Sequence, residues 1–255
     1  MFFVFKKSKF VIISLLFSLV VVLSLVCVNV GATAVYYNKP SKLLPIYSVK
    51  RSDNKISISF DAAYGDDYTL KILDILDEYN VKCTFFLVEF WVDKYPHLVK
   101  EIDKRGHEIG THSKTHPNMS KLTETEMQEE LISSSNKIKE ITGKQVKVFR
   151  PPFGDYNNKL IEVCGKLNLY PIQWSVDSLD WKNLSAKEIY NRVVTKTTSG
   201  SIILCHNNGL HTSEALPYIL ANLIEKGYEF TPICDLIYKD NYTIDVQGVQ
   251  SQALK

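Results

Sequence analysis

Residues 56–61 read Ile-Ser-Ile-Ser-Phe-Asp, and this stretch decides the predicted fold. Its apolar residues alternate with serines, as they do in a β-strand whose two faces have different surroundings. Asp61 directly follows Phe60, the last apolar residue of the stretch. Short runs rich in β-branched and aromatic residues recur along the chain. They predict further strands at residues 83–88, 108–110, 146–149, 171–176, 201–205 and 229–231.

Amphipathic stretches with helix start and stop signals separate these runs. Thr123-x-x-Glu126 and Ser185-x-x-Glu188 are capping-box patterns, and Gly106, Gly143 and Gly227 stand where a helix typically ends. Seven strands that alternate with helices predict an α/β fold with a mainly parallel sheet. The pattern alone leaves both an open sheet and a barrel as possibilities.

Ionisable side chains follow most of the predicted strands at the point where each strand ends. In a parallel α/β fold these ends share one face, where active sites are built. Residues spread over some 150 positions are therefore expected to meet: Asp61, His112, His116, Arg150, Asp177, Asp180 and His206.

The two histidines stand four residues apart, a spacing that puts both on one side of a helical turn. Neutral imidazole is a common metal ligand, so His112 and His116 predict a metal site, although two polar loop histidines are the alternative. Asp61 is expected to be a third ligand or a general base, with a helix N-cap or turn aspartate as the alternative. Asp66 and Asp67 either cap the next helix or fold back to complete the metal site.

Residues 150–154 read Arg-Pro-Pro-Phe-Gly, a stiff loop that carries a fixed charge. The prolines have no N–H, so the amides of Phe153 and Gly154 are the ones available to an oxyanion. Arg150 is expected to orient Asp61 and keep it ionised, with an ordinary surface salt bridge as the alternative.

Residues 177–181 place two acids beside Trp181. A carboxylate that contacts His206 would raise the pKa of that imidazole and make it a general acid. The Trp181 ring suits contact with a sugar ring or an acetyl group, and filling of the core is its alternative.

Taken together, these residues resemble the NodB-homology polysaccharide deacetylases of carbohydrate esterase family four, in their sporulation-type branch. The resemblance spans residues 53–238. The five motifs of the family occur in order as Ser59-Phe60-Asp61, His112-Ser113-x-x-His116, Arg150-x-Pro152-Phe153-Gly154, Asp177-x-x-Asp180-Trp181 and Leu204-x-His206.

The resemblance implies a distorted (β/α)7 barrel and a divalent metal, usually zinc and sometimes cobalt or nickel. It implies that His112 and His116 bind the metal and that Asp61, held by Arg150, is the base. By the same resemblance Asp180 tunes His206 as the acid, the amide of Phe153 serves the oxyanion, and Trp181 and Leu204 line the acetyl pocket. One position departs from the family: Ala62 stands where a second, metal-binding aspartate is usual.

The function expected from these features is a metal-dependent N-deacetylase acting on amino sugars of peptidoglycan or a related envelope or spore polysaccharide. A catalytically degenerate glycan-binding or structural protein and an O-deacetylase of another polymer are the alternatives. We expect a monomer.

The first residues carry a targeting signal. Lys6, Lys7 and Lys9 precede an apolar run over residues 10–30, long enough for a membrane anchor, and a cleavage site near Ala34 would make residues 1–34 a signal peptide instead. Either way the remainder is exported, as a membrane-anchored or a secreted protein. We expect a linker at 35–52, one domain at 53–240 and a tail at 241–255.

The net charge of +2 reflects this signal. Without those three lysines the chain has 27 basic and 28 acidic residues, so its charge predicts no nucleic-acid partner.

Overall fold

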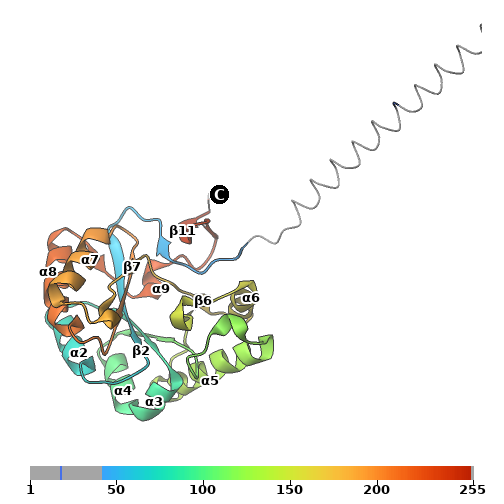
Figure 1. Cartoon of the computed structure of the whole chain (residues 1–255), viewed down its shortest axis with the longest axis horizontal. Helices are drawn as coiled ribbons and strands as arrows, with labels where there is room; N and C mark the ends of the chain where they lie inside the picture. Colours follow the sequence, from blue (N-terminus) through green and yellow to red (C-terminus); the bar gives the residue numbers. More distant parts are fainter. Residues whose placement is uncertain (1–17, 19–41, 254–255) are drawn as a thin grey trace, which may run out of the picture. The chain divides into compact units, whose positions relative to one another are not determined.

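The computed structural model describes residue 18 and residues 42–253 (Figure 1). Residues 43–255 form one compact unit. In the described part of the chain no helix has both the length and the apolar character needed to span a bilayer. The predicted anchor or signal peptide lies outside that part, apart from Ser18.

One parallel sheet organises this unit. Its strands follow the order β6-β5-β4-β3-β2-β8-β7, and β9 pairs with β2 off this path. The strands are β2 (Lys55–Ala62), β3 (Thr84–Leu87), β4 (Glu108–Thr111), β5 (Val148–Phe149), β6 (Tyr170–Pro171), β7 (Val176–Asp177), β8 (Ile202–His206) and β9 (Glu229–Phe230).

This sheet confirms the α/β prediction, and its seven-strand path fits a distorted barrel. The strand predicted at 171–176 is two strands. Between them the chain changes partners: the Gln173 amide donates to Ile46, and from the Ser175 amide, which donates to Ile202, the chain runs along β8. Among the described residues no ladder joins β6 to β7, so the barrel is open there.

Helices surround the sheet in Figure 1, with β2 near the centre of the unit. Both predicted capping boxes are present, and Gly143 ends its helix with a φ of 73°. The helices are α2 (Thr69–Glu78), α3 (Glu89–Lys94), α4 (Pro96–Lys104), α5 (Glu124–Thr142), α6 (Asn158–Lys166), α7 (Ala186–Lys196), α8 (Thr212–Glu225) and α9 (Ile233–Leu236).

The two faces of β2 have different surroundings. Ile56, Ile58, Phe60 and Ala62 belong to the apolar layer that also contains the buried faces of α2 and α8. Asp61 alternates with them and is in register with Phe86, which belongs to a second apolar cluster inside the sheet. Position 62 therefore faces the helices, on the opposite side from Asp61.

The predicted domain boundaries are wrong at both ends. Residues 43–52 are not a linker, because Ile46 and Val49 are buried and β1 (Ser48–Val49) joins a small second sheet. The predicted tail supplies the rest of that sheet as β10 (Tyr242–Ile244) and β11 (Val249–Gln252). The sequence does not predict this packing, because turn-forming residues surround position 40 and the three strands of the small sheet are only two to four residues long.

Candidate active site

A cavity of about 600 Å³ opens at the carboxyl ends of the strands. It unites side chains from β2, β8 and the loops that follow β4, β5 and β7, as the strand-end pattern predicts. The residues that line it are Asp61, Ala63, Tyr64, His112, His116, Pro151, Phe153, Gly154, Trp174, Asp177, Trp181, Leu204 and His206.

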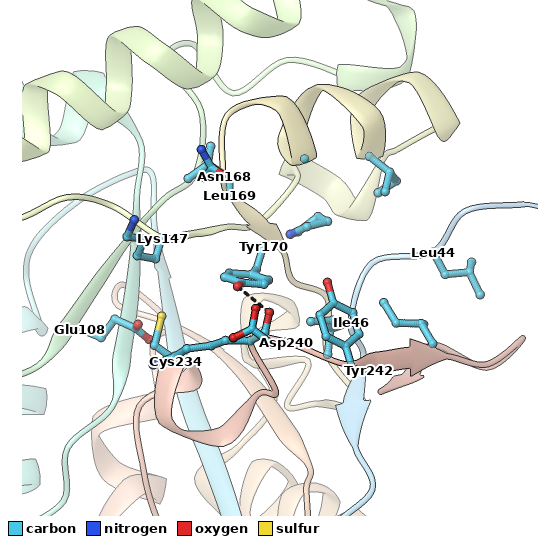
Figure 2. A pocket seen from close by; sticks show the side chains of 15 residues that line it. Leu44, Ile46, Glu108, Lys147, Asn168, Leu169, Tyr170, Cys234, Asp240 and Tyr242 are labelled. Carbon is cyan, nitrogen blue, oxygen red and sulfur yellow. Dashed lines mark hydrogen bonds between the residues drawn. The ribbon is translucent and has the colours of Figure 1, made fainter. Parts of the chain in front are cut away.

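A larger cavity, of about 920 Å³, lies at the amino ends of the strands (Figure 2). Glu108 and Tyr170, the first residues of β4 and β6, line it together with Tyr242. The Tyr170 hydroxyl donates to the Lys239 carbonyl at 3.1 Å. None of the predicted site residues lies there, so chemistry, and not size, identifies the site.

Asp61 is a buried residue that lines the smaller cavity. Its register partner on β8 is His206, and since paired residues of parallel strands share a face, both side chains point the same way. Nη1 of Arg150 donates to its Oδ1 at 2.7 Å, and its Oδ2 lies 3.6 Å from Nε2 of His112. Burial pushes the pKa of Asp61 up, but Arg150 and the neighbouring histidines outweigh it and hold that pKa below its ordinary value. Asp61 is ionised.

Arg150 is fully buried, so the surface salt bridge considered from the sequence is wrong. Its guanidinium lies 4.2 Å from the centre of the Phe86 ring, and Nη2 donates to the Gln173 carbonyl at 3.2 Å. Gly110 makes room for that ring, because a Cβ at position 110 would lie 2.7 Å from Phe86. These contacts fix the cation that orients Asp61.

The Nε2 atoms of His112 and His116 lie 3.2 Å apart. His112 donates from Nδ1 to the Arg150 carbonyl at 2.7 Å, which leaves its Nε2 unprotonated and able to accept from Nε2 of His116 or to bind a metal. Burial lowers the pKa of both imidazoles, that of His116 to about 4, so both are neutral at pH 7.

A loop, and not the expected helical turn, brings the pair together. Ser113 and His116 have φ values of 75° and 59°, and the Ser113 hydroxyl accepts from the His116 amide at 2.9 Å. Glu130 on α5 holds this loop: its Oε2 accepts from the amides of Lys114 and Thr115 at 2.8 Å each. No local sequence signal connects Glu130 with a loop some 15 residues away, so this contact is not predictable from the sequence.

His206 and Asp180 form the second charged pair, with Nδ1 and Oδ1 2.7 Å apart. Oδ2 of Asp180 accepts from the His206 amide at 2.8 Å and from the Thr212 hydroxyl at 2.7 Å. Burial opposes the charge on His206, but the hydrogen bond and the charge of Asp180 prevail and raise its pKa. Of the two predicted acids, Asp180 is therefore the partner, while Asp177 accepts from the Leu179 amide and lines the cavity.

Aromatic rings form the mouth of the cavity. Trp181 is 57% exposed, so its core-filling alternative is wrong. Trp174 also lines the cavity, although no motif in the sequence predicted it. Phe153 is 67% exposed, and its ring lies 4.5 Å from that of His116. Its φ of 59° costs roughly 1–2 kcal/mol in a residue with a Cβ, a strain typical of functional loops.

The histidine pair fits part of a divalent metal site. Two nitrogens bound to a tetrahedral zinc ion at about 2.05 Å would lie about 3.3 Å apart, close to the separation seen here. Within residues 42–253, no group of three or more histidine, cysteine, aspartate or glutamate side chains is arranged to hold a metal. Asp66 and Asp67 are not among the residues that line the cavity, and that one of them completes the ligand set stays a prediction. Their side chains do not cap α2 either, because its N-cap is Tyr68.

The chain is similar to several known proteins. Residues 48–172 match the family model described as polysaccharide deacetylase. A peptidoglycan-N-acetylglucosamine deacetylase of Bacillus cereus is 36% identical over 70% of this chain and 66% of its own length, just under two thirds. The peptidoglycan-N-acetylmuramic acid deacetylase PdaA of Bacillus subtilis is 32% identical over 76% of this chain and 75% of its own.

Among solved structures, BA3943 of Bacillus anthracis, a CE4 family pseudoenzyme, superposes with a TM-score of 0.74 and 31% identity. The superposition covers 83% of this chain and 73% of that one. A mutant of the same pseudoenzyme with restored enzymatic activity has the same TM-score at 34% identity, over 77% of this chain and 71% of that one.

Proposed function

Because the chain belongs to the polysaccharide deacetylase family, we propose that it is a metal-dependent hydrolase that removes N-acetyl groups from the amino sugars of peptidoglycan. One observation carries the proposal. A single cavity joins an ionised carboxylate, a neutral histidine pair and a histidine with a raised pKa. These are the groups that water attack on an amide and departure of its amine require.

Asp61 acts as the general base. Held ionised by Arg150, it accepts a proton from the water that attacks the acetyl carbonyl carbon. The carbonyl oxygen becomes an oxyanion, to which the amide of Phe153 donates. The strained backbone at Phe153 presets that loop before substrate arrives.

His206 acts as the general acid. Its Nδ1 is engaged by Asp180, so Nε2 carries the proton that passes to the sugar nitrogen as the C–N bond breaks. The products are acetate and a free amino sugar. Leu204 and Trp181 supply apolar surface for the acetyl methyl group.

His112 and His116 are the residues that would hold the metal, zinc first and cobalt or nickel as substitutes. When bound, a divalent cation supplies Lewis-acid activation of water and carbonyl oxygen. The neutral state of both imidazoles suits this role, because a protonated ring has no lone pair to offer.

The site of action follows from the first 34 residues, which we propose export the domain, either anchored in the membrane or cleaved near Ala34. Three lysines ahead of the apolar run support an outward-facing domain, where peptidoglycan lies. The resemblance to the sporulation-type branch makes spore peptidoglycan the second polymer to test.

Acetate release tests the activity. The purified chain, supplied with zinc or cobalt, should release acetate from N-acetylated muropeptides or from oligomers of N-acetylglucosamine. The Bacillus cereus relative serves as the positive control. If that relative is active in parallel and this chain releases none, the activity is refuted.

A degenerate glycan-binding protein is the second candidate, and a specific observation favours it. The described residues offer two histidines but no third histidine, cysteine or acidic ligand, and Ala62 faces the helices. Zinc titration separates the candidates. Sub-micromolar affinity that is lost in His112→Ala supports the enzyme, whereas glycan affinity without zinc binding supports the module. Parallel assays on O-acetylated glycans test the O-deacetylase alternative.

A further inference from the structure

Two exposed aromatic side chains beside the cavity have no role in the chemistry above. Tyr64, in the loop after β2, is 68% exposed, and Phe90, in the first turn of α3, is 37% exposed. Their ring centres lie 5.6 Å apart. Exposed apolar rings that pack on each other form a patch, and such patches commonly mark a binding surface.

The patch continues the wall of the cavity outwards. Tyr64 lines the cavity, and its ring centre lies 6.2 Å, edge to face, from that of His116, which also contacts Phe153. Phe90 does not line the cavity. A ligand that occupies the cavity and also covers Phe90 is therefore longer than the single acetylated sugar that the reaction needs.

Hydrogen bonds from buried side chains support the patch. The carbonyl of Gly65, next to Tyr64, accepts from the indole of Trp91 at 2.7 Å and from the side-chain amide of Asn207 at 3.0 Å. Trp91 is buried and follows Phe90 directly. These bonds join the loop that carries Tyr64 to the helix that carries Phe90, so the two rings are held together before any ligand binds.

We propose that Tyr64 and Phe90 form a flanking subsite that binds the neighbouring sugar of a glycan strand, and this rests on the proposed function. Flat apolar rings with exposed faces suit the apolar face of a pyranose. The charges close to the pair are of both signs, because Lys94 interacts with Asp66 and Lys114 with Glu89. A patch of apolar rings without a dominant charge suits an uncharged sugar better than an acidic stem peptide.

Calorimetric titration of the full chain with N-acetylglucosamine oligomers of two to six units tests the subsite without relying on turnover. We expect wild-type affinity to increase with length and Phe90→Ala or Tyr64→Ala to weaken hexamer binding about 5- to 10-fold, with less than a 2-fold change for the dimer. Phe90→Tyr, which keeps the ring, should bind the hexamer as wild type does. Tyr218→Ala removes an equally exposed ring from α8 and is the matched control.

Equal hexamer affinity in wild type and Phe90→Ala would overturn the subsite, as would an absence of hexamer binding by the wild type. Loss of binding in Phe90→Ala for an isolated stem peptide, but not for the glycan, would also overturn it. Length-dependent glycan binding that Phe90→Ala weakens supports the subsite even in a chain that releases no acetate. That result would refute only the enzymatic proposal.

Discussion

Nη1 of Arg150 and Oδ1 of Asp61 are 2.7 Å apart, and both side chains are buried at the end of the sheet. They come from positions 89 residues apart in the chain. A buried pair of this kind adds little net stability, because desolvation offsets the attraction, but loss of one partner leaves an unpaired charge. Its value here is chemical, since it keeps the proposed base ionised.

Replacement of Arg150 by methionine is expected to raise the pKa of Asp61, because burial then acts unopposed by the guanidinium. The acid limb of kcat/KM against pH should move to higher pH, and the free energy of unfolding should fall by about 3 kcal/mol. Arg105→Met is the control: it removes an arginine that pairs with Asp74 at the surface and should leave the limb in place. An unshifted limb in Arg150→Met would exclude Asp61 as the base that titrates there.

Asp180→Asn is expected to lower the pKa of His206, since it removes the charge that raises it. The proposed acid works in its protonated form, so activity falls as the pH rises through this pKa. In the variant that fall should begin at lower pH, and kcat should drop about 10²- to 10⁴-fold. Thr212→Val, which removes a neutral partner of Asp180, should move the basic limb much less. Identical basic limbs in all three proteins would contradict the assignment.

The strand-end rule explains why so much of the site is predictable from the sequence. Asp61, His112 and His206 end separate strands, and parallel strands place those ends on one face. The rule predicts that these side chains lie close together, but not which of them are in contact. Tertiary packing decides that Asp180, and not Asp177, reaches His206. The space for Asp180 depends on Gly209, because a Cβ there would collide with Thr212 and lie 2.9 Å from Asp180.

The errors come from segments whose partners are distant in sequence. The spacing of His112 and His116 suggests a helical turn, but the loop takes its shape from two positive φ values and from Glu130. Ile46 and Val49 look like linker residues because their partners are distant: Ile46 bridges to Ile172, and Val49 pairs with β11, some 200 residues later. Local patterns carry no information about such pairings.

Zinc should stabilise the chain through the histidine pair. We expect excess zinc to raise the melting temperature of the wild type, because binding to the folded state alone shifts the unfolding equilibrium. His112→Ala should abolish this rise, and a chelator should remove it together with any acetate release. His97→Ala changes an exposed histidine on α4 and should respond to zinc as the wild type does. An unchanged zinc response in His112→Ala would place the metal elsewhere.

Glu130 is expected to position the metal-binding loop without contacting the metal. Glu130→Ala removes the acceptor for two backbone amides and the Thr115 hydroxyl, which should lower the free energy of unfolding by about 1–2 kcal/mol. Zinc affinity should fall about 10-fold because His116 loses its support. Glu129→Ala is the matched control, since that neighbour makes only an exposed ion pair with Lys114. Equal zinc affinities in the two variants would contradict a positioning role.

His107 should make the stability of the fold depend on pH. Burial lowers its pKa from 6.5 to about 4, and among the described residues its Nε2 has no hydrogen-bond partner, so the folded state holds it neutral. Between pH 6.5 and pH 4 the unfolded chain binds the proton more readily, and the free energy of unfolding falls as the pH drops through this window. This contribution to stability, about 3 kcal/mol, is fully present above pH 6.5 and is lost by about pH 4.

Urea titrations of wild type and His107→Gln at pH 4.5 and pH 7 measure this dependence. His112 and His116 contribute in the same direction in both proteins, so the difference between the two slopes isolates His107. The variant should lose less stability on acidification than the wild type. Parallel stability curves for the two proteins would show that His107 is not the group that titrates.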